Sequence, residues 1–439
     1  MSAPQPEIIA VADAATPSLF ANRNYLWLWA SAAISSLGDY FTLIAMPWLV
    51  LTISGDPAAL GVAMALESLP RAAFMLFSGS ATDRYSARSV LLVSRGLFML
   101  ALAALALALL AGGIRLPHLY GFAVVFGLLS AFALPANRAL LPQVVDRSQI
   151  QQANSALMGS QQLIQLVAPV LAGLLIWGLP TVEAPTGARA DLSHIAYAFL
   201  LNAAAIFVAL LLLLRIRIAP SPGAGAGPAK VRLTEGFRYL GLDRGMRIAT
   251  LYMACVGFFA IGPLLTLLPQ LAAQRLHDGA LSYGMLYAVN GLGSILGFAL
   301  GGLLPKPDAR RLGLVIFTAD LVAGISIGWL GQSESFAVAA PALALIGVSA
   351  SYGGVLSLSW IQERIPPALA GRILSIVMFA VMGLTPVSMA AGGFLVAHWS
   401  LTTLTTISGF AIGIAALIGL ATPALNRFGA YPVPDRQTA

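Results

Sequence analysis

Three acidic residues lie deep inside very apolar stretches of the sequence: Asp39, Glu67 and Asp320. Each costs at least about 2.5–3.5 kcal/mol to place in hydrocarbon, so each needs a partner, a wet surface or a function. A carboxylate in a partly desolvated cavity can take up and release a proton, or it can bind a cation. For Asp320 we expect a simpler role, a polar bond to a neighbouring helix.

Asp39 belongs to a run of polar residues with the periodicity of a helix. Ser31, Ser35, Asp39 and Thr42 follow one another at spacings of four, four and three, which puts them on one helix face. We expect this face to line a wet cavity. Two roles stay open for Asp39: a carboxylate that binds a proton or a cation, and one that braces a neighbouring helix.

Glu67 and Arg71 stand four positions apart with the acid first, which is the favourable order for an ion pair within one helix. A paired Glu67 would be a poor proton carrier, because the arginine favours the charged carboxylate. The two residues therefore form either a structural ion pair or an element of coupling.

Uncharged hydrogen-bonding side chains complete the candidate site. Asn154, Gln161 and Gln165 follow one another at spacings of seven and four. This amide stripe either binds substrate or holds helices together. Asn290 and Tyr352 are the further candidates for substrate binding or coupling.

The elements that must position these side chains are membrane helices. The chain has 439 residues, of which 59% are hydrophobic and 9% are charged. A soluble domain carries about 25% charged residues, so this chain could not cover its surface in water. The net charge of +7 does not indicate nucleic-acid binding, since the basic residues fall in short turns and form no stripe with aromatic residues.

The sequence also argues against an enzyme. All four histidines fall near the expected outer loops, away from any serine–aspartate or metal-binding arrangement at membrane depth. The single cysteine, Cys255, provides neither a disulfide framework nor a metal cluster. A phosphate-binding loop of the G-x-x-x-x-G-K-[ST] type is missing, so ATP is not expected to drive the protein. We expect no cofactor and no metal.

Twelve segments are apolar over the roughly 20 residues that a spanning helix needs. They are residues 25–53, 57–80, 87–111, 117–141, 147–178, 194–215, 246–272, 280–304, 309–330, 335–361, 368–397 and 399–425. We therefore expect an all-α membrane protein with two six-helix bundles, at 23–215 and 246–427. A tail (1–22), a linker (216–245) with a short amphipathic helix near 233–240, and a second tail (428–439) complete the chain.

The two bundles read as copies of one another. Gly79 and Gly302 begin two charged turns 223 positions apart, and the same offset pairs Glu67 with Asn290. An offset of 220 pairs Gly127 with Gly347. A nearly constant offset over many positions indicates a duplicated chain. Two membrane halves related in this way leave a binding site between them.

The basic residues predict the orientation. Nineteen of the 24 lysines and arginines fall in the tails, the linker and the turns on one side of the expected bundles. The positive-inside rule puts that side, and both termini, in the cytoplasm.

The charged turn at residues 79–88 has a chemistry of its own. Gly79 allows two helices to approach closely, and Asp83 can cap a helix or pair with Arg138. Arg84 and Arg88 can pair with carboxylates such as Asp146. This set predicts a latch that locks one conformation, and the alternative is a topology signal without a gating role. In the second copy Lys306 replaces Asp83.

The same turn closely resembles the loop signature of the major facilitator superfamily. Further stretches are similar to its enterobactin-exporter and macrolide-efflux branch: residues 24–29, 34–39, 135–142, 153–157, 235–240 and 371–375. Residues 168–173 resemble a weakened form of an exporter motif whose small residues would pack closely against the eighth span.

The resemblance implies a secondary transporter that works by alternating access. It implies proton-coupled export of an amphipathic or cationic small molecule, such as a drug, a macrolide or a siderophore, across the bacterial inner membrane. The expected partners are the substrate, protons and the lipid bilayer, and a monomer suffices. An importer or facilitator with the same fold is one alternative, and a membrane sensor or scaffold is another.

Overall fold

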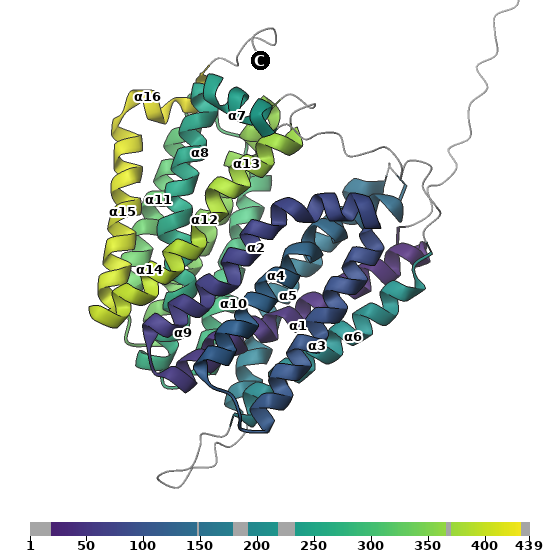
Figure 1. Cartoon of the computed structure of the whole chain (residues 1–439). Helices are drawn as coiled ribbons and strands as arrows, with labels where there is room; N and C mark the ends of the chain where they lie inside the picture. The colour runs from purple at the N-terminus through teal and green to yellow at the C-terminus, as the bar shows by residue number, and fades with distance from the viewer. Residues whose placement is uncertain (1–18, 147–148, 179–191, 218–232, 366–369, 432–439) are drawn as a thin grey trace, which may run out of the picture.

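The computed structural model describes residues 19–146, 149–178, 192–217, 233–365 and 370–431, and all regular structure in these ranges is helical (Figure 1). The N-terminal half contains α1 (Arg23–Ser54), α2 (Pro57–Tyr85), α3 (Ala87–Leu110), α4 (Leu116–Leu140), α5 (Ile150–Trp177) and α6 (Ser193–Arg215). The C-terminal half contains α8 (Arg244–Val256), η4 (Gly257–Ile261), α9 (Gly262–Arg275), α10 (Ala280–Leu303), α11 (Leu312–Leu330), α12 (Phe336–Arg364), α13 (Ala370–Met382), α14 (Thr385–His398) and α15 (Leu401–Ala421). Short helices α7 (Leu233–Leu242), α16 (Pro423–Asn426) and η6 (Phe428–Ala430) lie outside these bundles.

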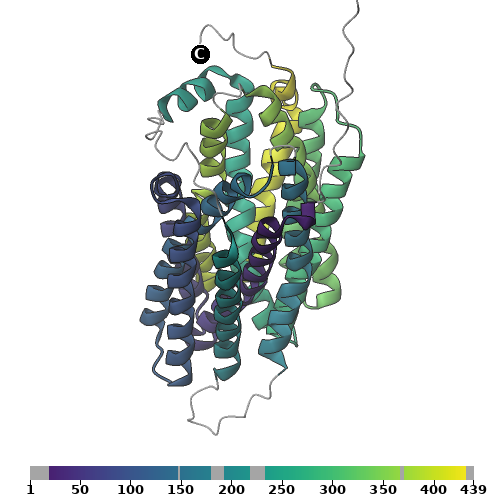
Figure 2. The same cartoon turned by 90° about the vertical axis from the view of Figure 1, so that its right-hand side faces the viewer.

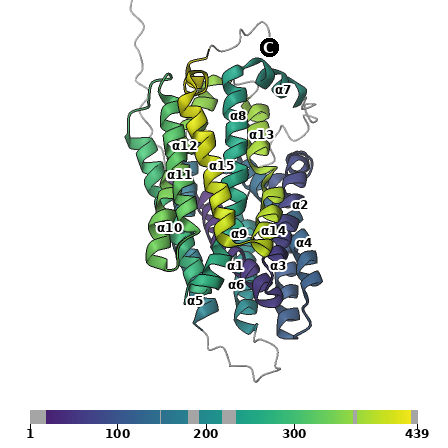
Figure 3. The same cartoon turned by 90° about the vertical axis from the view of Figure 1, so that its left-hand side faces the viewer.

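The spans agree with the hydropathy of the sequence. Within the described residues, eleven helical segments are long and apolar enough to cross a membrane. The one remaining predicted span, α2, is of similar length but holds the charged residues Glu67 and Arg71 and an internal proline, Pro70. The axes of the long helices are roughly aligned with one another, as Figure 2 and Figure 3 show. An all-α membrane fold of two six-helix halves is thus confirmed.

Polar caps fix where the first helix of each half begins. The side chain of Asn22 accepts hydrogen bonds from the backbone N–H groups of Asn24 and Tyr25 at the start of α1. The side chain of Asp243 accepts one from Met246 at the start of α8. Such caps satisfy N–H groups that have no partner within the helix.

Two spans of the C-terminal half are interrupted, and the interruptions face one another. The seventh span consists of α8, the π-helical segment η4 and α9, and the eleventh span breaks between α13 and α14. The Ser388 hydroxyl of α14 donates to the carbonyl oxygen of Phe258 in η4. A Cβ atom added to Gly257 would lie 2.8 Å from the carbonyl oxygen of Val381. The corresponding spans of the N-terminal half, α1 and α5, are unbroken α-helices.

The charged segment that starts at Gly79 is helical, which corrects the expectation of a turn. Helix α2 continues to Tyr85, and Ser86, with φ of 70°, forms the whole connection to α3. The prediction ended this span at residue 80 because charged residues usually leave the hydrocarbon. The helix extends beyond the apolar stretch because nothing between Gly79 and Tyr85 breaks it.

The duplication is visible in the closest helix contacts. A Cβ atom added to Gly127 of α4 would lie 1.9 Å from the carbonyl oxygen of Glu67 in α2. One added to Gly347 of α12 would lie 2.3 Å from the carbonyl oxygen of Asn290 in α10. These residues are the pairs that the sequence offset matched, so the repeated positions make the same contact in both halves.

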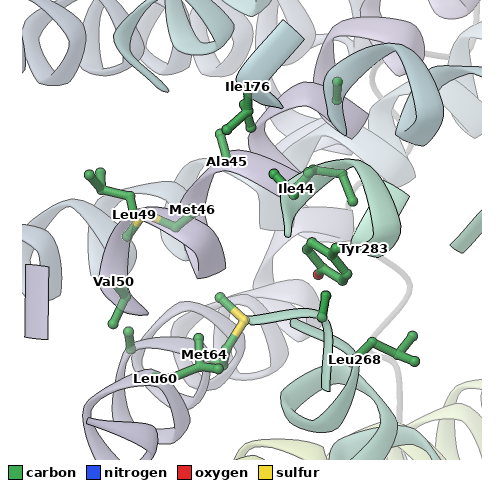
Figure 4. Close-up of a cluster of buried hydrophobic side chains, with 14 of the residues drawn as sticks. Ile44, Ala45, Met46, Leu49, Val50, Leu60, Met64, Ile176, Leu268 and Tyr283 are labelled. Carbon is green, nitrogen blue, oxygen red and sulfur yellow. The ribbon is translucent and has the colours of Figure 1, made fainter. Parts of the chain in front are cut away.

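Within the described residues, the two halves share an apolar core at one end of the molecule only. A large apolar cluster combines Leu49, Leu60 and Ile176 of the first half with Leu268 and Tyr283 of the second (Figure 4). At the other end, which holds Asn22, Asp243 and Phe428 and which we call the terminal end, each half has a separate cluster. The two halves are therefore joined at the end opposite the terminal end.

Candidate functional site

A polar hollow of about 230 Å³ lies between α1 and α5. Its lining residues are Ser36, Tyr40, Met158, Gln161, Gln162 and Gln165. The hollow adjoins the second half, because the Cγ atom of Gln165 would lie 3.4 Å from a Cβ atom added to Gly291 of α10. The structure thus brings together Gln161 and Gln165 of the predicted amide stripe. Asn154 is exposed and does not belong to the lining.

Small residues bring α5 against α10 beside this hollow. A Cβ atom added to Gly173 would lie 2.5 Å from the carbonyl oxygen of Ala280, and one added to Gly284 would lie 2.2 Å from that of Pro169. Ala168 and Ala172 are fully buried. The expected close packing of residues 168–173 against the eighth span is confirmed. A second close contact between the halves joins Gly61 of α2 to Gly393 of α14.

Asp39 forms an ion pair that the sequence analysis missed. The two terminal nitrogens of the Arg95 guanidinium, Nη1 and Nη2, donate from α3 to the two carboxylate oxygens of Asp39 at 2.9 Å each. The Arg95 side chain is 15% exposed and that of Asp39 is 36% exposed. A two-pronged pair of this kind fixes the relative position of two helices as well as balancing their charges. Asp39 therefore braces α1 against α3, and a role in coupling stays a prediction.

Ser31 and Thr42 on the polar face of α1 are buried and bound to α6, so the expectation of a wet cavity was wrong at these positions, whereas Asp39 on the same face is partly exposed and binds α3. The Ser31 hydroxyl donates to the carbonyl oxygen of Ala209 at 2.9 Å. The Asn202 amide donates to the Thr42 hydroxyl at 2.7 Å, and Ser35 is buried. A helical spacing of polar residues identifies the face but not its neighbour, and α6 supplies hydrogen-bond partners where water was expected.

Glu67 and Arg71 form the predicted ion pair. Arg71 also donates through Nε to the Ser130 hydroxyl of α4 at 2.9 Å, so the pair connects α2 with α4. In the second half the Asn290 amide donates to the carbonyl oxygen of Leu343 at 3.3 Å and connects α10 with α12. Both positions therefore hold helices together within a half, and their roles in coupling or substrate binding stay predictions.

The remaining predicted residues are dispersed. Tyr352 is half-buried against the apolar cluster at the terminal end of the second half. Arg88 does not meet Asp146, because its guanidinium donates to the carbonyl oxygens of Leu213 and Leu214 at the end of α6. Arg138 and Asp146 are exposed, and neither takes part in an ion pair among the described residues. The side chains of the other latch residues, including Asp83 and Arg84, lie outside the described part of the chain.

A buried ion pair closes the terminal end of the second half. Arg364 of α12 binds both carboxylate oxygens of Asp243, and Asp243 is fully buried. Arg364 also donates to the carbonyl oxygen of Tyr431 at 2.7 Å, and its own carbonyl accepts from the Tyr239 hydroxyl at 3.0 Å. Burial, reinforced by the negative charge of Asp243, raises the pKa of Tyr239. The linker helix α7 and the segment after α16 are thereby tied to the end of α12.

Asp320 binds a tyrosine rather than a cation. The Tyr252 hydroxyl of α8 donates to a carboxylate oxygen of Asp320 in α11 at 2.8 Å. Asp320 is buried. The expectation of a polar bond from Asp320 to a neighbouring helix is confirmed.

Comparison with known proteins identifies the family to which this chain belongs. The sequence matches the family profile of the Major Facilitator Superfamily over residues 28–389. The enterobactin exporter EntS of Citrobacter koseri is 26% identical over 404 residues, which cover 89% of this chain and 90% of that protein. The enterobactin exporter EntS of Escherichia coli O127:H6 is 26% identical over 338 residues, 75% of each chain.

Solved structures show the same fold at low sequence identity. A bacterial homologue of the iron transporter ferroportin in an inward-facing state superposes with a TM-score of 0.70 at 17% identity, covering 93% of this chain and 99% of that one. The nucleoside transporter NupG superposes with a TM-score of 0.72 at 10% identity, covering 91% and 99%. The chain therefore belongs to the Major Facilitator Superfamily of membrane transporters.

Proposed function

We propose that the chain is a proton-driven exporter of amphipathic small molecules that works by alternating access. The observation that carries the proposal is the polar hollow beside the contact between the two halves, where transporters with internal repeats bind their substrates. The similarity to enterobactin exporters, over 90% of the Citrobacter koseri protein and 75% of the Escherichia coli one, supports the direction of transport.

The substrate would enter this conformation from the terminal end. The halves share their core at the opposite end and have separate cores at the terminal end. Because the basic residues predict that the terminal end faces the cytoplasm, the conformation corresponds to a state open to the cell interior. An exporter loads its substrate in that state.

The lining of the hollow favours an amphipathic substrate over a cationic one. Three glutamines, a serine and a tyrosine supply hydrogen-bond donors and acceptors, Met158 supplies an adaptable apolar surface, and none of these side chains carries a charge. Its volume is below the roughly 300–1,000 Å³ of common ligand pockets, so it holds part of a drug-sized molecule. Neutral macrolides and siderophore-like compounds are therefore the first substrates to test.

The test is uptake into inverted membrane vesicles from an efflux-deficient host, with dyes, macrolides and siderophores as probes. A proton gradient should drive accumulation of at least one probe, and its collapse should abolish accumulation. Flux that equilibrates without regard to the gradient would indicate a facilitator, and uptake into right-side-out cells would indicate an importer.

The role of the hollow and of Asp39 can be separated in the same assay. Gln161→Leu and Gln165→Leu should raise the probe concentration at half-maximal rate, whereas Gln151→Leu, at an exposed position on the same helix, should not. Asp39→Asn with full transport at every pH would exclude Asp39 as the coupling group.

A further inference from the structure

The three carboxylates within the spans differ in how their charge is balanced. Asp39 binds the guanidinium of Arg95, and Glu67 binds that of Arg71. Among the described residues Asp320 has no ion-pair partner, and the one hydrogen bond found for its side chain there comes from the neutral Tyr252 hydroxyl. A buried charge without a partner is far costlier than a paired one, so such a group favours its neutral form.

Within the described part of the chain, the helices that pack against α11 offer no unpaired cation to balance Asp320. Helix α11 packs against α12, α15, α16 and η6, and the last three contain no ionisable side chain. In α12 the ionisable residues are Tyr352, Glu363 and Arg364; Glu363 pairs with Lys306, and Arg364 pairs with Asp243. In α8 the residue that faces Asp320 is Tyr252, whose ring packs edge-on against Phe317, and Cys255, one turn further on, is a titratable neighbour of Tyr252.

We propose that Asp320 is the group of this transporter that binds the coupling proton, a step that rests on the function proposed above. In the conformation described, Asp320 is a neutral carboxylic acid that accepts the hydrogen bond from Tyr252. Its O–H bond breaks when the carboxyl becomes accessible to water, which leaves one negative charge on Asp320 and one proton on water. Tyr252 keeps its own proton throughout.

Tyr252 connects Asp320, where the proton binds, to the two interrupted spans of the second half. Tyr252 lies in α8, five residues before the π-helical segment η4. Helix α8 contacts α13, and η4 contacts α14, so a shift of α8 reaches both parts of the interrupted eleventh span. Ionised Asp320 therefore favours a conformation in which α8 has moved to admit water, and neutral Asp320 favours the one described here.

Infrared difference spectroscopy of the purified full-length protein measures the proton directly, without any substrate. At pH values above about 6, exposed carboxyls with ordinary pKa values near 4 are already ionised. The wild-type protein should show the carbonyl band of a protonated carboxyl that disappears as the pH rises. Asp320→Asn should lose this band, while Asp39→Asn and the exposed Thr318→Ala on the same helix should keep it.

Tyr252→Phe guards against misfolding of the Asp320 variant. Removal of its hydroxyl should keep the band and shift it to higher frequency, because the carboxyl carbonyl loses a hydrogen bond. A band that survives in Asp320→Asn, or one that does not shift in Tyr252→Phe, would overturn the proposal.

A transport experiment then tests coupling, with a radiolabelled neutral macrolide as the probe. Asp320→Asn should lose accumulation driven by a proton gradient but keep exchange of the macrolide at equal pH on both sides. Gradient-driven accumulation that survives in this variant would overturn the role of Asp320. If the wild-type protein moves no probe with any gradient, the proposed export fails, and the infrared band still decides whether Asp320 holds a proton.

Discussion

The two halves of the molecule make the same joint at their terminal ends with different chemistry. In the first half, the Asn22 amide donates to the carbonyl oxygen of Val144 at 2.9 Å. In the second half, Asp243 binds Arg364 in a buried ion pair. Asn22 and Asp243 are 221 positions apart, and Val144 and Arg364 are 220 positions apart. Matching positions of the two copies therefore form the joint, and only the kind of bond differs.

A similar contrast exists between the first and third spans of each half. The first half connects α1 and α3 through the charged pair Asp39–Arg95, and the second connects α8 and α11 through Tyr252 and Asp320. The duplication therefore preserved which helices are connected. The kind of bond differs: an ion pair in the first half and a hydrogen bond from a neutral hydroxyl in the second.

The largest expected effect comes from breaking the joint of the second half. Arg364→Ala leaves the Asp243 carboxylate buried without a balancing cation and should lower the free energy of unfolding by about 3–5 kcal/mol. Asn22→Ala removes a cap and one hydrogen bond and should cost about 1–2 kcal/mol. Unfolding midpoints of the purified variants measure both. Equal losses would refute the contrast, and the exposed Arg310→Ala serves as control.

The glycine contacts should respond equally in the two halves. Gly127→Ala and Gly347→Ala each force a Cβ atom into a backbone carbonyl of the neighbouring helix, at a cost of up to about 3 kcal/mol. Gly121→Ala and Gly354→Ala, on the same two helices, point a methyl group into open space and should be neutral or slightly stabilising. Monodispersity and thermal stability in detergent report the difference. Loss in one half alone would argue against a shared architecture.

Double-mutant cycles should show which bond between a first and a third span has the larger coupling energy, Asp39–Arg95 or Tyr252–Asp320. We expect a coupling energy of about 1.5 kcal/mol for Asp39 with Arg95, because both partners are charged. For Tyr252 with Asp320 we expect about 0.6 kcal/mol, the average for hydrogen bonds between membrane helices. The cycles use Asp39→Asn with Arg95→Gln and Asp320→Asn with Tyr252→Phe, followed by thermal unfolding. The reverse order would show that the neutral connection is the stronger brace.

The smallest effect should come from removing the hydroxyl groups of two tyrosines that form hydrogen bonds at the terminal ends of the halves. The Tyr25 hydroxyl donates to the carbonyl oxygen of Ala153 at 3.1 Å, and that of Tyr239 donates to Arg364 at 3.0 Å. Each phenylalanine variant loses one hydrogen bond and should cost about 1 kcal/mol or less. A much larger loss for Tyr239→Phe than for Tyr25→Phe would mean that the buried ion pair depends on the tyrosine.

The sequence was sufficient for features that depend on local spacing or on the repeat. Apolar length predicted the spans, an i, i+4 spacing predicted the Glu67–Arg71 pair, and small residues predicted the contact of α5 with α10. The conserved offset matched Gly127 with Gly347 before their common contact was visible. The match of Val144 with Arg364 follows the same offset and was open to the same reasoning.

The sequence was insufficient where a polar side chain finds its hydrogen-bond or ion-pair partner on another helix. Arg95 is 56 positions from Asp39, and no periodicity reveals how far α1 and α3 are rotated toward one another. The spacing of Ser31 and Thr42 is the same whether they contact water or α6. No local sequence pattern identifies Asn202, the residue of α6 that binds Thr42. The extent of α2 was also misjudged, because charge marks the membrane boundary and not the end of a helix.

The π-helical segment of the seventh span has a mechanical consequence. Its last residue, Ile261, occupies the place in the second copy that Asp39 occupies in the first. One copy thus carries an ion pair where the other carries a π-helical turn, and π-helical turns are sites where a helix can bend without unwinding. We therefore expect that, if the protein changes conformation during transport, the second bundle bends at this turn while the first moves as a more rigid unit.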